Sequence, residues 1–192
     1  MELVLDVENT TTTKNNKLHL DPFERGNSLV MVGVQPLAAK NPSTYIFDHN
    51  DTTRSDDIVS NHYAVQSCLD RTDTLVCHNV AYDLIWLWES GFKYTKGVYD
   101  TMLSQYVMNK GINNSLSLSH LAEYYKCSYL KQDVLKNYFS KGYSTKEIPR
   151  QELETYLIHD VLATKEIYEK QTKKLQNTTL LKTVQLTNEV CI

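Results

Sequence analysis

Two acidic residues interrupt the first apolar segment of this 192-residue chain. The stretch LVLDVE at residues 3–8 surrounds Asp6 and Glu8 with apolar side chains, which predicts a buried β-strand. Side chains alternate along a strand, so both carboxylates face the same side about 6–7 Å apart. A hard divalent cation between them would offset the repulsion of two like charges. A strand end with two solvated acids would account for the same residues equally well.

A third acid stands at the start of a predicted helix. Residues 73–77 are predicted as a strand, and residues 78–88 show helical spacing of apolar positions with Asp83 in the first turn. Strand-to-helix junctions are where α/β proteins form sites, so Asp83 could point back at the first strand. The local sequence by itself favours the simpler interpretation, in which the helix dipole stabilises the carboxylate.

A phenol and a carboxylate lie one turn apart on the longest predicted helix, residues 150–176, which begins after Pro149. Tyr156 and Asp160 share one side of this helix, beside its apolar face. Their position inside an apolar stretch suggests a site, and a core tyrosine with an exposed aspartate is the alternative. The expected core face of the helix consists of Leu153, Leu157, Val161 and Tyr168.

The other elements must position these residues. The polar segment 9–27 is expected to be a long loop that borders a groove. Asp100 is expected to be a structural N-cap for a helix at 102–108. Further strands are expected at 28–35, 44–47 and 97–99, and further helices at 56–69, 115–125, 131–139 and 179–192.

Composition is that of a single globular domain, with 41% hydrophobic and 22% charged residues. No apolar run is long enough to cross a membrane. The net charge of −3 divides unevenly: residues 1–100 hold 8 basic and 14 acidic residues, and residues 101–192 hold 12 and 9. A recurring series of lysines in the second half is either a solvated face or a rim for nucleic acid: Lys126, Lys131, Lys136, Lys141 and Lys146. The four cysteines form no CxxC pair and suggest reduced structural thiols.

Together, the acidic segments resemble the three motifs of the DEDD exonuclease superfamily, in its tyrosine-bearing branch. Residues 6–8, 79–83 and 156–160 match the three motifs in order, and residues 99–103 fall where that family often carries a similar segment. The resemblance implies an α/β fold of the RNase H-like (DnaQ-like exonuclease) type, with a mixed, mostly five-stranded sheet flanked by helices. It spans almost the whole chain.

Within the superfamily, the chain resembles the N-terminal proofreading domain of a bacteriophage family A (polymerase I-like) DNA polymerase. This implies a 3′-5′ exonuclease domain at residues 1–178 and a helical lead-in at 179–192 to a polymerase domain of the same polypeptide. The implied partner is the 3′ end of single-stranded DNA, in the cytoplasm of an infected bacterial host, without a membrane. One departure is that Asn9 and then Thr10 follow the first-motif glutamate, where the family often has threonine directly.

The resemblance also implies roles for the site residues. Two divalent cations, Mg²⁺ or Mn²⁺, would be held about 4 Å apart. Asp6, Glu8 and Asp160 would hold the first, and Asp6 would bridge to the second with support from Asp83. Tyr156 would aim the attacking water. The residues expected to hold the terminal nucleotide are Asn9 and Thr10 through their backbone, and His78, Asn79 and Tyr82.

Two other functions fit parts of the same pattern. A free-standing exoribonuclease of the ribonuclease D type carries similar motifs, usually with an added helical RNA-binding domain. A catalytically inactive module that only binds single strands is the second alternative, and the presence of all five expected catalytic residues argues against it. A nucleotide-binding Rossmann domain is disfavoured because no glycine-rich turn follows the first strand.

Overall fold

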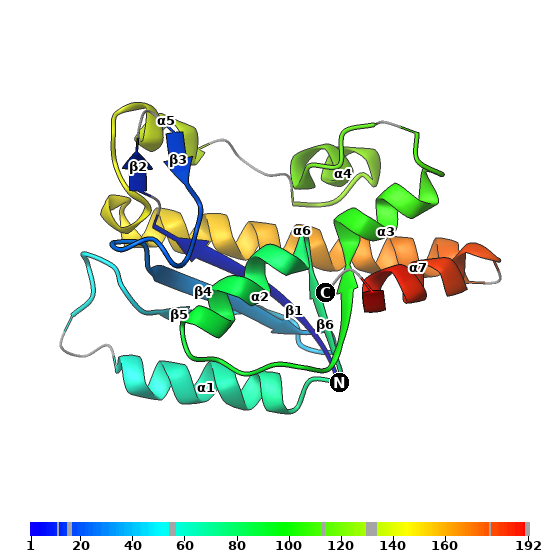
Figure 1. Ribbon diagram of the computed structural model, residues 1–192, viewed down its shortest axis with the longest axis horizontal. Coiled ribbons are helices and arrows are strands. Elements are labelled where there is room, and N and C mark those ends of the chain that lie inside the picture. The colour runs from blue at the N-terminus through cyan, green and yellow to red at the C-terminus, as the bar shows by residue number, and fades with distance from the viewer. Residues whose placement is uncertain are drawn as a thin grey trace.

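The computed structural model describes residues 1–10, 12–14, 17–53, 57–112, 114–129, 134–176 and 178–190. Figure 1 shows a central sheet with helices packed around it. The strands are β1 (Glu2–Asn9), β2 (Thr12–Lys14), β3 (Lys17–His19), β4 (Leu29–Pro36), β5 (Ser43–Ile46), β6 (Thr74–Cys77) and β7 (Gly97–Asp100). The helices are α1 (Ile58–Asp70), α2 (Val80–Glu89), α3 (Thr101–Met108), α4 (Leu118–Tyr124), α5 (Val134–Ser140), the 3₁₀ turn η1 (Thr145–Glu147), α6 (Arg150–Leu175) and α7 (Leu180–Val190).

The main sheet has five strands in the order β5-β4-β1-β6-β7. β1 in the centre pairs antiparallel with β4 and parallel with β6, and β7 continues the parallel half. The expected mixed sheet flanked by helices is confirmed. Because β1, β6 and β7 are parallel, their carboxyl ends and the residues that follow them lie at one edge of the sheet.

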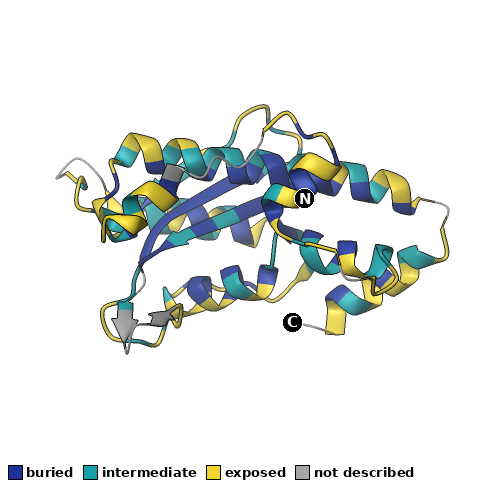
Figure 2. Cartoon of the chain, turned by 90° about the horizontal axis from the view of Figure 1, so that it is seen from above, coloured by how far each residue is buried: buried dark blue, intermediate teal, exposed yellow. Residues whose placement is uncertain are grey.

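Each face of the sheet has its own core. On one face, α6 packs through Leu153, Leu157 and Val161 against residues such as Val4 and Val76. On the other face, α1 and α2 pack against Leu3, Leu5 and their neighbours in a second apolar cluster. Figure 2 shows the long central strands largely buried, and helices that combine buried and exposed residues. The expected core face of α6 is confirmed, because all four of its predicted residues are buried.

Side-chain caps fix where several helices begin. The Asp100 carboxylate accepts hydrogen bonds from the backbone amides of Met102 and Leu103, which confirms its predicted capping role for α3. Asp57 caps α1 through the amide of Ser60. Ser117 caps α4 through the amide of His120, so that helix begins three residues later than the spacing at 115–125 predicts.

Two expectations need correction. The segment 9–27 is not a loop throughout, because β2 and β3 form a two-stranded antiparallel sheet within it. The 3₁₀ turn η1 just before α6 was not expected, and a capping box between Ser144 and Glu147 holds it. The predicted helix at 131–139 falls partly outside the described residues, which resume with α5 at Val134.

The last helix, α7, packs against α3 and β7, and buries Val184 and Asn188. In the part of the chain that the structure describes, no helix is long and apolar enough to cross a membrane. Cys68, Cys77 and Cys127 are free thiols, and Cys191 lies outside the described residues.

Candidate active site

Three of the expected carboxylates meet between β1 and α6. Asp6 and Glu8 extend from β1 on the face that also carries Val4, the face covered by α6. Asp160 lies on α6 and is buried. One oxygen from each carboxylate lies within 4.8 Å of one oxygen from each of the others. Segments more than 150 residues apart in the sequence therefore bring three negative charges to one point.

A strand glycine allows this approach. Gly33 of β4 lies opposite Asp6 in the antiparallel pair. A Cβ atom at Gly33 would come within 2.9 Å of Leu157 Cγ and of Val161 Cγ2, a distance that side chains do not tolerate. The bare backbone at Gly33 thus lets α6 rest directly on the sheet beside Asp6, and Asp160 lies on the same stretch of that helix.

Asp83 comes to the same region from the first turn of α2. Its side chain is only 2% exposed, and its Oδ2 atom has no hydrogen-bond partner among the described residues. Burial raises the pKa of Asp83 well above its usual value, and the neighbouring charges of Asp6 and Asp100 raise it further. Contacts with the Cys77 thiol and the Val7 backbone oppose that rise. Asp83 is therefore a desolvated carboxyl near Asp6, outside the tight group of three.

Tyr156 lies one turn before Asp160 and is partly buried against the apolar cluster under α6. Burial raises the pKa of its hydroxyl, and the charges of Asp160, Glu8 and Asp6 add to the rise, in that order. Its pKa thus responds to all three clustered acids, and the phenol stays protonated at neutral pH. Such a group can donate a hydrogen bond to a water or phosphate oxygen.

Asp100 organises the loop that precedes Asp83. Besides capping α3, its carboxylate accepts hydrogen bonds from the backbone amides of Asn79 at 3.0 Å and Val80 at 3.1 Å. Asn79 is held with a φ of 73°, a left-handed conformation that few residues other than glycine adopt. His78 Nδ1 lies 2.9 Å from the hydroxyl of Thr101. Two of the expected nucleotide-binding residues are thus fixed by the segment at the end of β7.

Asn9 and Tyr82 link the end of β1 to α2. The Tyr82 hydroxyl donates to Asn9 Oδ1 at 2.8 Å, and Asn9 Nδ2 donates to the carbonyl oxygen of Thr10 at 3.0 Å. The strand register shifts between Glu8 and Asn9. Asn9 is therefore turned toward α2 directly after the carboxylates.

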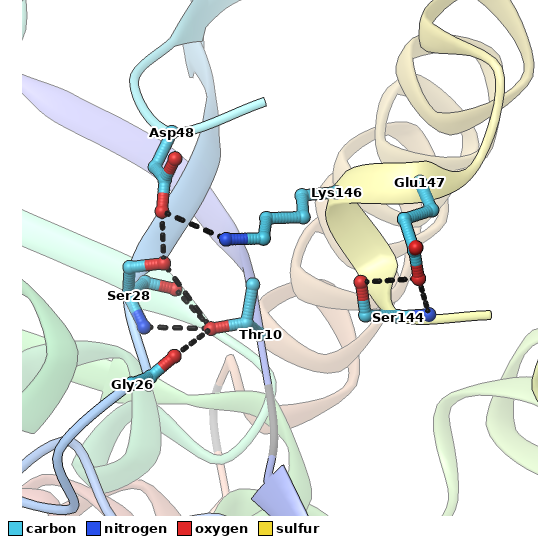
Figure 3. A network of polar contacts seen from close by, with 7 residues as sticks. All are labelled: Thr10, Gly26, Ser28, Asp48, Ser144, Lys146 and Glu147. Atoms are coloured by element: carbon cyan, nitrogen blue, oxygen red, sulfur yellow. Dashed lines mark hydrogen bonds and ion pairs between the residues drawn. The ribbon is translucent and has the colours of Figure 1, made fainter. Parts of the chain in front are cut away.

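Thr10 is buried in a polar network that closes the segment after β1 (Figure 3). Its hydroxyl accepts a hydrogen bond from the backbone amide of Ser28 at 2.7 Å. The Ser28 hydroxyl donates to Asp48 at 2.6 Å, and Asp48 forms an ion pair with Lys146 of η1 at 3.7 Å. The Thr10 side chain thus holds the neighbouring segment at Ser28 in place. The contact expected between this position and the nucleotide involved the main chain of Thr10 and not its side chain.

A sequence profile described as 3′-5′ exonuclease matches residues 28–176, more than half of the chain. The chain belongs to the 3′-5′ exonuclease family. The match begins after β1, so Asp6 and Glu8 lie outside it. In this exonuclease the structure joins them to Asp160, which lies inside the match. No curated protein sequence matches the chain.

Solved structures share the fold at low sequence identity. NrnC from Brucella melitensis with bound pGG superposes with a TM-score of 0.65 at 17% identity, covering 98% of this chain and 79% of that one. The catalytic core of RRP6 from Trypanosoma brucei superposes with a TM-score of 0.64 at 16% identity, and the match covers 97% of this chain and 44% of that one. Exonuclease X in complex with 5′ overhanging duplex DNA superposes with a TM-score of 0.50 at 12% identity, and the match covers 98% of this chain and 99% of that one. These likenesses confirm the RNase H-like exonuclease fold.

The candidate site fits a divalent metal. Three convergent carboxylates and the buried Oδ2 of Asp83 supply hard oxygen donors, which Mg²⁺ and Mn²⁺ prefer. Without a cation, this concentration of negative charge would be unfavourable in a partly buried place. A structure of the NrnC relative contains bound Mg²⁺.

Sequence reasoning missed two positions that support the site. Gly33 stands inside a predicted strand, and an isolated strand glycine is a known signal of close approach by another segment. Lys146 was expected on a solvated face or in a rim for nucleic acid, but its ion pair with Asp48 ties η1 to the network around Thr10. That pairing joins residues about 100 positions apart, and no local pattern indicates it.

Proposed function

We propose that this 3′-5′ exonuclease uses two divalent cations to remove nucleotides from the 3′ end of single-stranded DNA. The observation that carries the proposal is the meeting of Asp6, Glu8 and Asp160 within 4.8 Å. Asp6, Glu8 and Asp160 would hold one cation, and Asp83 together with Asp6 would hold the other. When bound, the cations would lower the pKa of a water and stabilise the leaving 3′-oxygen.

The chain's own residues orient the reacting groups. The protonated hydroxyl of Tyr156 hydrogen-bonds the attacking water and aims it at phosphorus. Water adds to phosphorus and the P–O3′ bond breaks, which releases a nucleoside 5′-monophosphate and leaves a new 3′-hydroxyl on the shortened strand. Asn79, Tyr82, His78 and the backbone at Asn9 and Thr10 hold the terminal nucleotide.

We propose further that the domain proofreads for a bacteriophage family A DNA polymerase, in the cytoplasm of the infected host. The support is the order and spacing of the three motifs across residues 6–160. On this proposal, residues 1–178 form the exonuclease domain, and residues 179–192 lead to the polymerase. DNA as substrate is also supported by the shared fold of exonuclease X, which was solved with duplex DNA.

A free-standing exoribonuclease of the ribonuclease D type is the second candidate. This chain superposes on NrnC bound to pGG with a TM-score of 0.65, and on exonuclease X with one of 0.50. The higher score favours the exoribonuclease. Matched DNA and RNA oligonucleotides of one sequence separate the two. Faster release of nucleotides from the RNA would replace the DNA proposal with the RNA one.

The test of the nuclease proposal is Asp6→Ala, assayed on a 3′-labelled single strand with Mg²⁺ or Mn²⁺. We expect loss of degradation with an unchanged circular dichroism spectrum. Asp70→Ala, an exposed acid at the end of α1, is the control and should retain full activity. Activity that survives in Asp6→Ala would contradict the assignment of the cation site.

A further inference from the structure

The helix α4 packs beside α6 (Figure 1). A groove lies there, between residues of α4 and the turn after it and residues of the C-terminal half of α6, away from the carboxylates. It has a volume of about 480 Å³. Among the described residues, those that line it are all lysines or tyrosines, and none is acidic. We refer to it as the lysine–tyrosine groove, formed by Tyr124, Tyr125, Lys126, Lys170, Lys173 and Lys174.

The floor of the groove is closely packed. An apolar cluster that includes Leu121, Ala163 and Ile167 packs α4 and the following turn against α6. Tyr125 is buried, and its hydroxyl donates to Gln105 Oε1 at 2.6 Å. The Tyr125 ring therefore holds one position, and a ligand would meet a preformed surface.

The groove is positively charged. Lys170 donates to Glu166 at 3.2 Å and to the carbonyl oxygen of Tyr125 at 2.9 Å, so its charge is largely compensated. Lys126, Lys173 and Lys174 are exposed and form no ion pair with any residue that the structure describes. Glu123 and Glu169 are exposed nearby in the sequence but do not line the groove. Three uncompensated lysines around one cavity favour a polyanion.

The tyrosines narrow the class of polyanion. Tyr124 is 56% exposed, and its ring meets Tyr125 edge-on with 4.9 Å between centroids. Lys174 Nζ lies 4.8 Å from the Tyr124 centroid and 4.4 Å from that of Tyr125. An exposed aromatic ring among lysines offers a stacking surface for a base beside contacts for phosphates. An acidic peptide would use the lysines but would gain little from the ring.

We propose that the lysine–tyrosine groove binds single-stranded nucleic acid upstream of the scissile 3′ end, a proposal that rests on the proposed nuclease function. α6 joins the two places, since Asp160 and Lys174 are fourteen residues apart on it. That separation is about 21 Å at 1.5 Å per residue. It corresponds to roughly six stacked nucleotides at 3.4 Å each. A long strand reaches both places, and a dinucleotide reaches only the carboxylates.

The test compares a 12-nucleotide single strand with a dinucleotide in steady-state kinetics on the full chain. In Lys173→Glu/Lys174→Glu, we expect the KM for the 12-mer to rise about tenfold or more, with kcat unchanged. The dinucleotide should show no change. Tyr124→Ala should raise the 12-mer KM about tenfold as well. The slope of log KM against log salt should fall by about 1.4 in the double lysine variant, since two phosphate contacts are lost.

The control is Lys93→Glu/Lys182→Glu, which makes the same change of charge at exposed lysines outside the groove. Equal effects in this control, or equal effects on the dinucleotide, would overturn the proposal.

If the wild-type chain degrades neither substrate, the nuclease proposal fails by itself. The groove is then judged by fluorescence anisotropy of a labelled 12-mer in EDTA. Binding that is tenfold weaker in the Lys173/Lys174 variant, and unchanged in the control variant, supports a nucleic-acid site in the groove. Displacement of the 12-mer by polyglutamate of equal total charge overturns it.

Discussion

The side chain of Asn188 accepts a hydrogen bond from the backbone amide of Asp100, with 2.5 Å between Oδ1 and N. Its Nδ2 donates to Ser104 Oγ at 3.2 Å and to the carbonyl oxygen of Val184 at 2.8 Å. Asn188 is only 2% exposed. Since Asp100 also holds the amides of Asn79 and Val80, the last helix of the chain is bonded to the residue that shapes the entry to α2.

Asn188→Ala should therefore lower stability and loosen the loop before Asp83. We expect the free energy of unfolding to fall by about 2 kcal/mol, because a buried backbone amide loses its acceptor. Denaturant titration measures this, and hydrogen exchange at Asn79 and Val80 should accelerate. Gln185→Ala, at an exposed position on the same helix, is the control. If both variants are equally stable, the bond to Asp100 contributes nothing.

Gly33→Ala should separate the two halves of the carboxylate cluster. The added methyl meets Leu157 and Val161 at 2.9 Å, so α6 must move away from β1. We expect a cost of about 1–3 kcal/mol in stability, as overpacking usually brings. The Mn²⁺ affinity measured by calorimetry should fall about tenfold, because Asp160 moves with α6.

Two further variants check that mechanism. Combining Gly33→Ala with Val161→Ala removes one of the two clashing carbons, and part of the Mn²⁺ affinity should return. Gly97→Ala places a methyl 3.0 Å from the Asp73 backbone oxygen, away from α6, and should leave Mn²⁺ binding unchanged. An unaltered affinity in Gly33→Ala itself would show that α6 can shift without moving Asp160.

The sequence predicted how most of the candidate residues are placed because the signals for their placement are local. Alternation along residues 3–8 puts Asp6 and Glu8 on one face, and helical spacing puts Tyr156 and Asp160 on one side of α6. The capping role of Asp100 was also readable, since an aspartate directly before a helical pattern is typical of an N-cap. These features depend on the local sequence alone, and the structure has all of them.

What the sequence did not predict depends on contacts between distant segments. The bonds from Asn188 to Asp100 and from Thr10 to Ser28 join residues that no periodicity relates. The β2–β3 pair was missed because its short polar strands lack the apolar alternation that identifies a strand. For Asp83, the local sequence favoured a dipole effect, and only the fold shows how fully its carboxyl is buried near Asp6.

The raised pKa of Asp83 predicts how stability depends on pH without metal. Its unfolded pKa is about 3.9, and burial, together with Asp6 and Asp100, raises the folded pKa well above that. Between the two values the folded state binds more protons, so stability in EDTA should fall as pH rises, by at most about 1.4 kcal/mol per pH unit. The loss begins near pH 4 and ends at the folded pKa.

Urea titrations across pH in EDTA measure this effect. Asp83→Asn should flatten the pH dependence and be more stable than the wild type at pH 7. Adding Mg²⁺ should stabilise the wild type, because a bound cation offsets the charge. Glu189→Gln, at an exposed position on α7, is the control. A slope in Asp83→Asn as steep as in the wild type would assign the effect to another group.

Tyr156→Phe tests the orientation of the attacking water. The pKa of Tyr156 is raised by burial and by Asp160, so its hydroxyl keeps its proton at neutral pH and can hydrogen-bond the water. We expect kcat to fall about 10- to 100-fold, since a misplaced nucleophile costs orientation. Mn²⁺ affinity should stay within about twofold, because the three clustered carboxylates are unchanged in this variant. Tyr106→Phe, at an exposed position on α3, should leave both unchanged. If Tyr156→Phe lowers both kcat and Mn²⁺ affinity, then Tyr156 positions the carboxylates and does not orient the water. If kcat is unchanged, Tyr156 has no role in the reaction.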